Sequence, residues 1–212
     1  QPLYDLELAG AELDGIDWSG ASLERLNLAG ATLARCNFAS ARLARTNLSG
    51  ADLTDARLHA ADLTRADLSR ATLDGAQLCS AILKNADLTS ARGSKTSFEG
   101  ASLDGADLRQ ARLTEAVFDR ASLADINGSK ADISRSSFAH ANLAGAILRA
   151  AKLKEASLPC ANVDGADLRE ADLAGANVYG VELANAKSNG AILRSLVEIA
   201  PPEEDINVSS QG

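Results

Sequence analysis

The residues Gly93-Ser94-Lys95-Thr96 combine the small and basic types that cradle a phosphate group in nucleotide-binding proteins. A phosphate loop needs the pattern G-x-x-x-x-G-K-[ST] at the start of a helix, because backbone N–H groups must point at the phosphates. Here the first Gly is absent, no helical pattern follows, and Gly-Ser-Lys recurs at 128–130 at the same offset. We therefore predict neither a nucleotide site nor any bound cofactor.

The other residues that could do chemistry are 29 acidic side chains, two histidines and three cysteines. Their spacing matches no nucleophile–base motif, and whether any of them meet depends on the fold. The net charge of −8 argues against a nucleic-acid-binding surface, which needs a basic footprint. No stretch approaches about 18 consecutive apolar residues, so no membrane span is predicted.

The dominant pattern of the chain is a five-residue repeat. Every fifth residue from Leu3 to Leu193 gives 39 positions, and all but three of them are Leu, Ile, Val, Phe or Trp. The position two residues earlier is Ala in 29 of 37 cases between Ala11 and Ala191. A helix would spread this period around its axis, and a flat strand would alternate it between faces. A short extended step followed by a corner places both apolar positions inside a coil.

Aromatic residues at the central apolar position reveal how many corners close one coil. These residues are Trp18, Phe38, Phe98, Phe118 and Phe138. All are separated by multiples of 20, so four five-residue sides form one coil and the aromatic side chains form a column in the core.

Units such as Ala51-Asp52-Leu53-Thr54-Asp55 and Ala171-Asp172-Leu173-Ala174-Gly175 resemble the A-(D/N)-L-x-x repeat of the pentapeptide-repeat family. The resemblance covers residues 3–193 and implies an all-β fold, the right-handed quadrilateral β-helix of that family. We expect nine to ten of these four-sided coils over residues 1–193. The repeat has no N-terminal lid, so we also expect it to be a module of a longer protein, or its first coil to contact a partner.

Such a solenoid has a filled core and flat outer walls, and this limits the chemistry that its acidic residues, histidines and cysteines can perform. General acid–base catalysis needs a pocket that shifts a pKa, and none is expected here. His59 and His140 lie four coils apart, too far to share a metal. Cys79 and Cys160 are equally distant, beyond the reach of a disulfide. We predict no catalytic, metal or cofactor-binding residues, no enzyme activity, and a reducing, cytoplasmic location in a bacterium.

The C-terminal residues depart from the five-residue period. Leu193, Leu196, Val197 and Ala200 have helical spacing before Pro201-Pro202, which predicts a short helix over 194–200. This helix either covers the last coil or forms a homodimer contact, as the resemblance to gyrase-protecting family members implies. Residues 201–212 are predicted to be a disordered tail.

Irregular positions interrupt the repeat at two glycines. Gly128 replaces a central Leu, but Ile126 replaces the usual Ala beside it, so the volume is conserved. Gly93 has no such partner and predicts a small void or a bent wall. Arg92, Lys95 and Arg112 form a small basic spot beside it.

One side of the coil carries few charges and is named here the low-charge wall. It covers the aromatic column, and its outward residues include only five charged side chains. The residues with the most distinctive side chains on it are His59, Cys79, Val117, Pro159 and Tyr179. We interpret it as a protein-docking surface, the alternative being a wall that needs only small soluble residues.

These features predict a non-catalytic scaffold that binds a protein partner. The alternative implied by the resemblance is a DNA-mimicking protein that binds a type II topoisomerase, as quinolone-resistance members do. Against this alternative, the repeat region carries 25 acidic and 20 basic residues, so it is only mildly negative. A third reading is a structural spacer without any partner.

Overall fold

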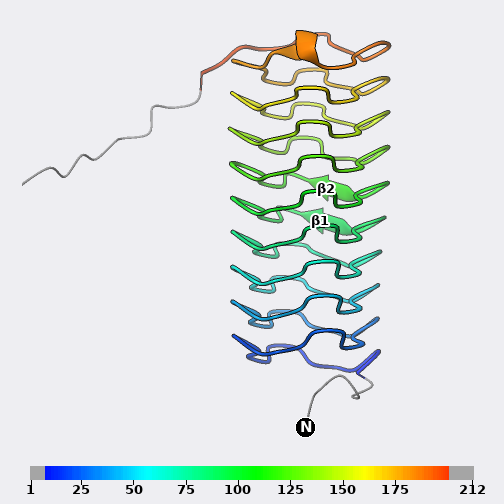
Figure 1. Ribbon diagram of the computed structural model, residues 1–212, viewed down its shortest axis with the longest axis vertical. Helices are drawn as coiled ribbons and strands as arrows, with labels where there is room; N and C mark the ends of the chain where they lie inside the picture. The colour runs from blue at the N-terminus through cyan, green and yellow to red at the C-terminus, as the bar shows by residue number, and fades with distance from the viewer. Residues whose placement is uncertain (1–7, 201–212) are drawn as a thin grey trace, which may run out of the picture.

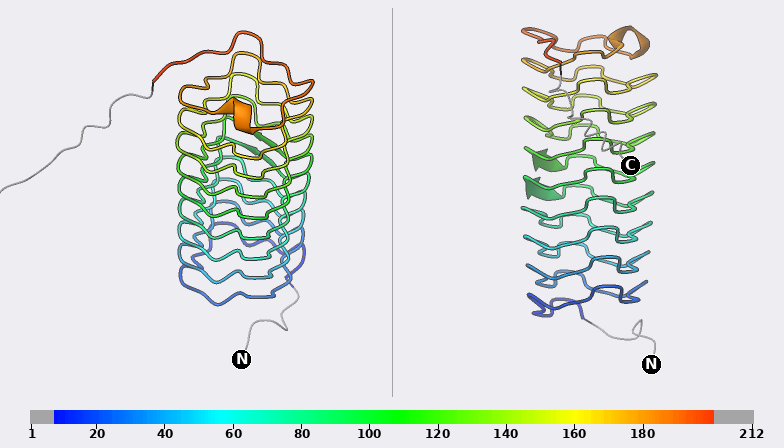
Figure 2. Two further views of the ribbon diagram at one scale, coloured as in Figure 1. Left: turned by 45° about the horizontal axis from the view of Figure 1, so that its top comes forward. Right: turned by 90° about the vertical axis from the view of Figure 1, so that its left-hand side faces the viewer.

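The computed structural model describes residues 8–200, which form a tower of stacked four-sided coils (Figures 1 and 2). Parallel bridges join equivalent residues of adjacent coils, from Glu12 with Thr32 to Asn177 with Val197. Each coil therefore contains four of the five-residue units, as the aromatic spacing predicts. The predicted tail at 201–212 lies outside the described residues, as do residues 1–7.

The central residue of each unit and the residue before it bond to neighbouring coils. The N–H of Leu53 donates to the carbonyl of Thr72 in the next coil, at 2.8 Å. The N–H of Asp52 donates to the carbonyl of Ala31 in the previous coil, at 3.0 Å. Each side thus contributes only one or two residues to a parallel ladder, which explains why few continuous strands form.

A tight turn follows each central residue. The N–H of Ala56 donates to the carbonyl of Leu53 at 3.0 Å, and Asp55 closes the turn with a φ of 56°. This left-handed conformation recurs at every fifth residue from Gly10 to Ser195, with Asn185 as the exception. Left-handed backbone is unfavourable for residues other than glycine. The inter-coil hydrogen bonds and the buried core must therefore hold these corners in place.

The core consists of the central residues and the alanines two positions before them, nearly all of them fully buried. Phe98, Phe118 and Phe138 stack with ring centroids 4.9 Å apart and planes within 7° of parallel, so the predicted column is confirmed in this part. Phe38 is fully buried and Trp18, in the same column, is half-buried. The separation equals the spacing of hydrogen-bonded strands, because each ring repeats the one below it.

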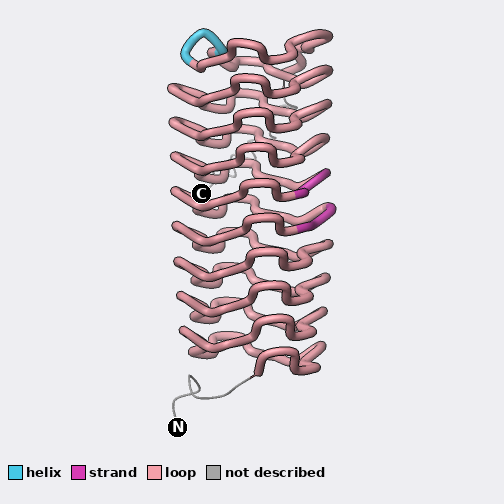
Figure 3. Tube along the Cα trace, turned by 90° about the vertical axis from the view of Figure 1, so that its right-hand side faces the viewer, coloured by secondary structure: helices cyan, strands magenta, loops and turns pink. Residues whose placement is uncertain are grey.

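Two short strands and one helical turn are the regular elements of the described part. Strand β1 (Arg92–Ser94) pairs in parallel with β2 (Arg112–Thr114), and they lie in adjacent coils on one side of the tower (Figure 3). The 3-10 helix η2 (Leu183–Asn185) forms a corner near the C-terminal end.

The predicted C-terminal helix over 194–200 is wrong. Ile192 bridges to Asp172 and Val197 bridges to Asn177, so the coil pattern continues beyond residue 193. The Asn177 side chain also bonds the backbone of Ile199, accepting from its N–H at 3.0 Å and donating to its carbonyl at 2.8 Å. A helix over 194–200 would be so short that its stability in isolation would be marginal. The open edge of the preceding coil instead supplies ready hydrogen-bond partners for extended backbone.

The residues predicted to form that helix do not make a lid either. Leu193 and Val197 are each 38% exposed, Leu196 is half-buried and Ala200 is exposed. The described part of the tower therefore ends in partly exposed apolar side chains.

The structure places the Thr96 side chain against Gly93, where a void or a bent wall is predicted. A Cβ atom at Gly93 would lie 2.4 Å from Oγ1 of Thr96 and 3.1 Å from Cβ of Leu73, so the space next to the glycine Cα is occupied. The buried Thr96 hydroxyl donates to the carbonyl of Leu73 at 2.8 Å, which holds it there. Thr96 stands where most repeats have Ala, so it adds volume beside the glycine.

Gly128 is compensated in a similar way. A Cβ atom there would lie 2.8 Å from Cδ2 of Leu148 and 3.9 Å from Cδ1 of Ile126. Ile126 therefore contributes as predicted, and Leu148 of the next coil fills most of the space.

The Gly93–Thr96 pair generates a test by substitution. Gly93→Leu restores the consensus residue, yet we expect it to destabilise the protein by about 1–3 kcal/mol because its Cβ atom would lie 2.4 Å from Oγ1 of Thr96. The double variant Gly93→Leu/Thr96→Ala restores both consensus residues and should recover most of that loss. Chemical denaturation of both variants and of Thr96→Ala measures the coupling. A stabilised Gly93→Leu single variant would show that the void exists.

Candidate interaction surfaces

The residues with catalytic or metal-binding chemistry stay apart in the structure. Within residues 8–200, no group of three or more His, Cys, Asp or Glu side chains could hold a metal ion. The segment Gly93–Thr96 begins within β1 and is not followed by a helix, so it lacks the geometry of a phosphate loop. No helix in the described part is long and apolar enough to span a membrane.

All three cysteines are free. Cys36 is buried, and burial raises the pKa of its thiol. Its Sγ atom lies 3.0 Å from the carbonyl oxygen of Leu13, to which it donates, so it fills a core position as a small hydrogen-bonding residue. Cys79 is half-buried beside Ser97, and Cys160 is exposed.

The low-charge wall lies on one side of the tower, as the repeat register requires. His59 and Tyr179 are exposed, and Cys79 and Val117 are half-buried. Pro159 is buried, so it contributes to the flatness of the wall but offers no accessible side chain. The accessible part of the wall is therefore smaller than the predicted set of residues.

Four of the five charged side chains of this wall have partners within it, whereas Arg57 is exposed and forms no ion pair or side-chain hydrogen bond with a described residue. Arg120 and Glu99 form an ion pair at 3.8 Å. Asp119 accepts hydrogen bonds from the hydroxyl of Ser137 and from the backbone N–H of Ala139. The backbone N–H of Ser19 lowers the pKa of Asp17, helped by the Ser19 and Asn37 side chains. These internal contacts leave the wall less polar than its composition indicates.

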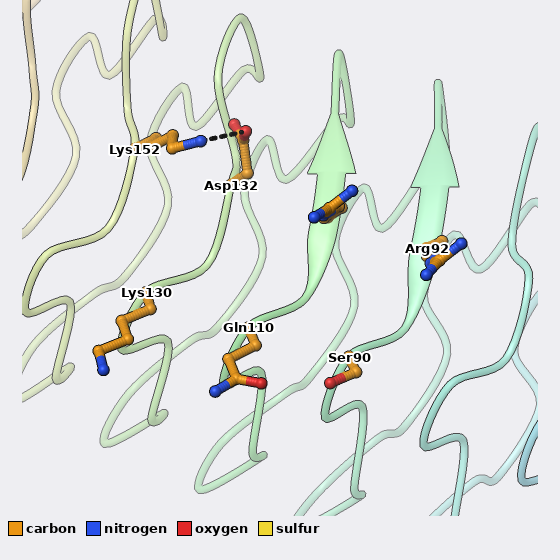
Figure 4. A pocket seen from close by; sticks show the side chains of 7 residues that line it. Ser90, Arg92, Gln110, Lys130, Asp132 and Lys152 are labelled. Carbon is orange, nitrogen blue, oxygen red and sulfur yellow. Dashed lines mark hydrogen bonds and ion pairs between the residues drawn. The ribbon is translucent and has the colours of Figure 1, made fainter.

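A second surface, the basic groove, lies at the corner between two other sides (Figure 4). It is an open groove of about 590 Å³ in the middle of the tower. Its lining residues are Ser90, Arg92, Gln110, Arg112, Lys130, Asp132 and Lys152. Arg92, Arg112, Asp132 and Lys152 form one row along the tower, and Ser90, Gln110 and Lys130 form a parallel row across the corner.

The cations of the basic groove are incompletely neutralised. Asp132 pairs with Lys152 at 3.3 Å. Burial raises the pKa of Asp132, but hydrogen bonds from Ser134 and the charge of Lys152 outweigh it and leave the pKa below its usual value. Asp132 therefore stays ionised and is committed to Lys152. Arg92, Arg112 and Lys130 make no ion pair with any described residue.

Arginines on the neighbouring side show the opposite arrangement. Arg169 forms a forked hydrogen bond with Asp167, and this contact lowers the pKa of Asp167 to about 2 despite its burial. Arg109 binds both carboxylate oxygens of Asp107 in the same way. Each of these arginines has a carboxylate two residues earlier in its own unit. Arg92 and Arg112 have none at that spacing.

Only part of the basic groove is predicted by the sequence. Arg92, Lys95 and Arg112 are predicted to form one basic spot, but Lys95 does not line the groove, and Lys130 and Lys152, which do, are not in that prediction. Lys130 belongs to the adjacent side, and Lys152 lies two coils above Arg112. Comparison of equivalent positions in successive coils, on both sides of one corner, would have found them.

The sequence profile of pentapeptide repeats matches the chain eight times, over residues 3–38, 31–70, 71–110, 111–149 and 146–185. The chain belongs to the pentapeptide-repeat family. Proteins of this family fold as right-handed quadrilateral β-helices, which confirms the predicted fold class. They are generally non-enzymatic, and no catalytic family is indicated.

Solved structures of other pentapeptide-repeat proteins are similar to this one. HetL, involved in heterocyst differentiation regulation in the cyanobacterium Nostoc sp. strain PCC 7120, is 31% identical over 90% of this chain and 92% of its own, with a TM-score of 0.39. The plasmid-mediated fluoroquinolone resistance protein QnrB1 is 18% identical over 85% and 87%, with a TM-score of 0.55.

A third similar structure is a pentapeptide repeat protein from the thylakoid lumen of Arabidopsis thaliana. It is 34% identical over 49% of this chain and 69% of its own, with a TM-score of 0.29. A comparison with curated protein sequences gave no match.

Proposed function

We propose that this pentapeptide-repeat protein is a non-catalytic, rigid interaction module that binds a protein partner through its low-charge wall. The observation that carries the proposal is the combination of a filled core with a wall that has only five charged side chains, four of which have partners within it. Binding such a wall requires little desolvation of unpaired charge, which favours protein contact.

Rigidity adds to this argument. The backbone of every coil bonds to the coils above and below it, so the wall changes little when a partner binds. A preorganised surface loses little conformational entropy on association, which allows even a flat contact to be useful. Three free cysteines support a reducing, cytoplasmic setting as part of the proposal.

Serine-to-lysine substitutions test the low-charge wall. Ser137 and Ser157 lie on this wall in adjacent coils, each directly before the buried central residue of its unit. Ser102 and Ser122 occupy the same repeat position on the next side. We expect S137K/S157K to lose a partner that the wild type captures from a native extract, because two charges must be buried on binding. The matched variant S102K/S122K should retain it. Equal capture by both variants would show that the partner binds elsewhere.

A second candidate function is supported by a column of carboxylates on the side next to the low-charge wall. Asp104, Asp125 and Asp164 lie along it. Burial opposes ionisation of Asp104, but Ser122, Ser102 and Lys84 lower its pKa overall. Such a column favours DNA mimicry and binding to a type II topoisomerase. Arg45 and Arg65 interrupt it further down the same side, and the likeness to QnrB1 concerns the fold alone.

A gyrase supercoiling assay with a fluoroquinolone tests this second candidate. A topoisomerase-binding mimic protects the enzyme, and D104K/D125K should abolish the protection. If the low-charge wall alone carries the function, we expect no protection at any protein concentration.

The proposal also includes a homodimer contact at the C-terminal end, although no helix forms there. Ile192, Val197 and Ile199 are 41%, 38% and 64% exposed and would be covered by a second copy. Light scattering should then give twice the chain mass, and V197E/I199E should give the mass of one chain. A single-chain mass for the wild type at high concentration would exclude the contact.

A further inference from the structure

We propose that the basic groove binds a short acidic segment of a partner protein, in extended conformation along the axis of the tower. This inference rests on the proposed function only in that the ligand belongs to a protein. It concerns a different surface from the low-charge wall, and the two can be tested separately.

Charge distribution is the first argument for an anionic ligand. Four cations and one carboxylate line the basic groove, a net charge of +3 on a protein whose total is −8. Arg92 and Arg112 are direct partners in the register of β1 and β2, so two like charges face each other across one strand spacing. Like charges directly opposite each other in a sheet are unfavourable. An anion held between them removes this repulsion.

The types of side chain indicate a carboxylate ligand. A guanidinium presents a planar fork of donors that matches a carboxylate bidentately, and two such forks lie one above the other. Lys130 lines the same groove from across the corner, in a row with Gln110 and Ser90 (Figure 4). The amide and hydroxyl supply donors that can bond the backbone or polar side chains of a peptide.

The limited length of the basic groove favours a peptide over a nucleic acid. Arg92 and Lys152 are three coils apart, roughly 14–15 Å, which an extended peptide covers with about four or five residues. The row that contains them continues to Asp172 beyond Lys152, and to Asp52 two coils below Arg92. These carboxylates would repel the continuing phosphates of a long polyanion. An extended peptide projects alternate side chains to one face, about 6.6 Å apart, which suits an Asp or Glu at every second residue.

The backbone beneath the basic groove is held tightly. β1 and β2 are the continuously paired strands of the described part, and the N–H of Ser94 donates to Asp74 at 2.7 Å. The side chains of Thr96 and Leu73 pack directly against Gly93 of β1. The two arginines are therefore anchored on rigid elements, which a binding site requires.

Fluorescence anisotropy with a labelled Glu-Gly-Glu-Gly-Glu peptide tests the proposal on the full chain. We expect the wild type to bind it, and to bind more weakly as salt is added. R92Q/R112Q should weaken binding at least about tenfold, because it removes two charge-assisted hydrogen-bonding groups. The matched variant R45Q/R65Q makes the same charge change in adjacent coils on another side, and its affinity should stay within about twofold of the wild type.

Both variants should fold, because Gln already occurs at each repeat position that is changed. Gln77 directly precedes a central residue, as Arg92 and Arg112 do, and Gln110 closes a turn with a positive φ, as Arg45 and Arg65 do. The unfolding midpoint of R92Q/R112Q should equal or exceed that of the wild type, since a like-charge contact is removed. A lower midpoint would mean that the arginines serve stability, and would overturn the proposal.

Three other results would also overturn it. These are the absence of peptide binding by the wild type, equal loss in both arginine variants, and tighter binding of a single-stranded oligonucleotide of equal charge. Displacement of the peptide by an equal concentration of inorganic phosphate would assign the basic groove to a free anion instead. Failure here leaves partner capture by the low-charge wall intact, and S137K/S157K should not alter peptide affinity.

Discussion

Hydrogen bonds between successive coils hold this structure together, and they all depend on one register. The N–H of each central residue donates to a carbonyl of the next coil, and the preceding N–H donates to a carbonyl of the previous coil. The offset along the chain is the same over most of the described part, so equivalent residues of successive coils stand directly above one another. The same ladder holds the left-handed corners, where many residues other than glycine keep a positive φ that they would not adopt readily alone.

The constant register has a direct effect on the core. Each side chain repeats the equivalent one of the coil below after a single translation, so rings stack in parallel and leucines form columns. Where a column lacks its apolar side chain, neighbouring side chains pack against the glycine. Thr96 lies against Gly93, while Leu148 and Ile126 lie against Gly128. Buried hydroxyls elsewhere in the core donate to a carbonyl of the coil below, as those of Thr46 and Ser136 do.

A filled core leaves the outer walls as the place for function. Outward residues are free of the packing constraint, and their rows along the tower are set by the same register. This arrangement produces a wall with few charges, most of them paired within it, on one side, and a groove with three unpaired cations at another corner. Neither surface needs a loop or insertion, since equivalent residues of successive coils are brought within one strand spacing.

The sequence by itself determined the coiled fold through its five-residue period, and the 20-residue spacing of the aromatic residues determined the four sides of each coil and the side on which each residue lies. It could do so because every unit meets the same local requirement, with two apolar residues inward and a corner after them. Tertiary structure alone decided the C-terminal end, where the open edge of the preceding coil outcompeted the helical spacing of Leu193, Leu196 and Val197. It also decided that the Thr96 side chain packs against Gly93, and that Lys130 and Lys152 line one groove with Arg92 and Arg112. These outcomes depend on contacts between coils and across a corner, and no five-residue unit contains them.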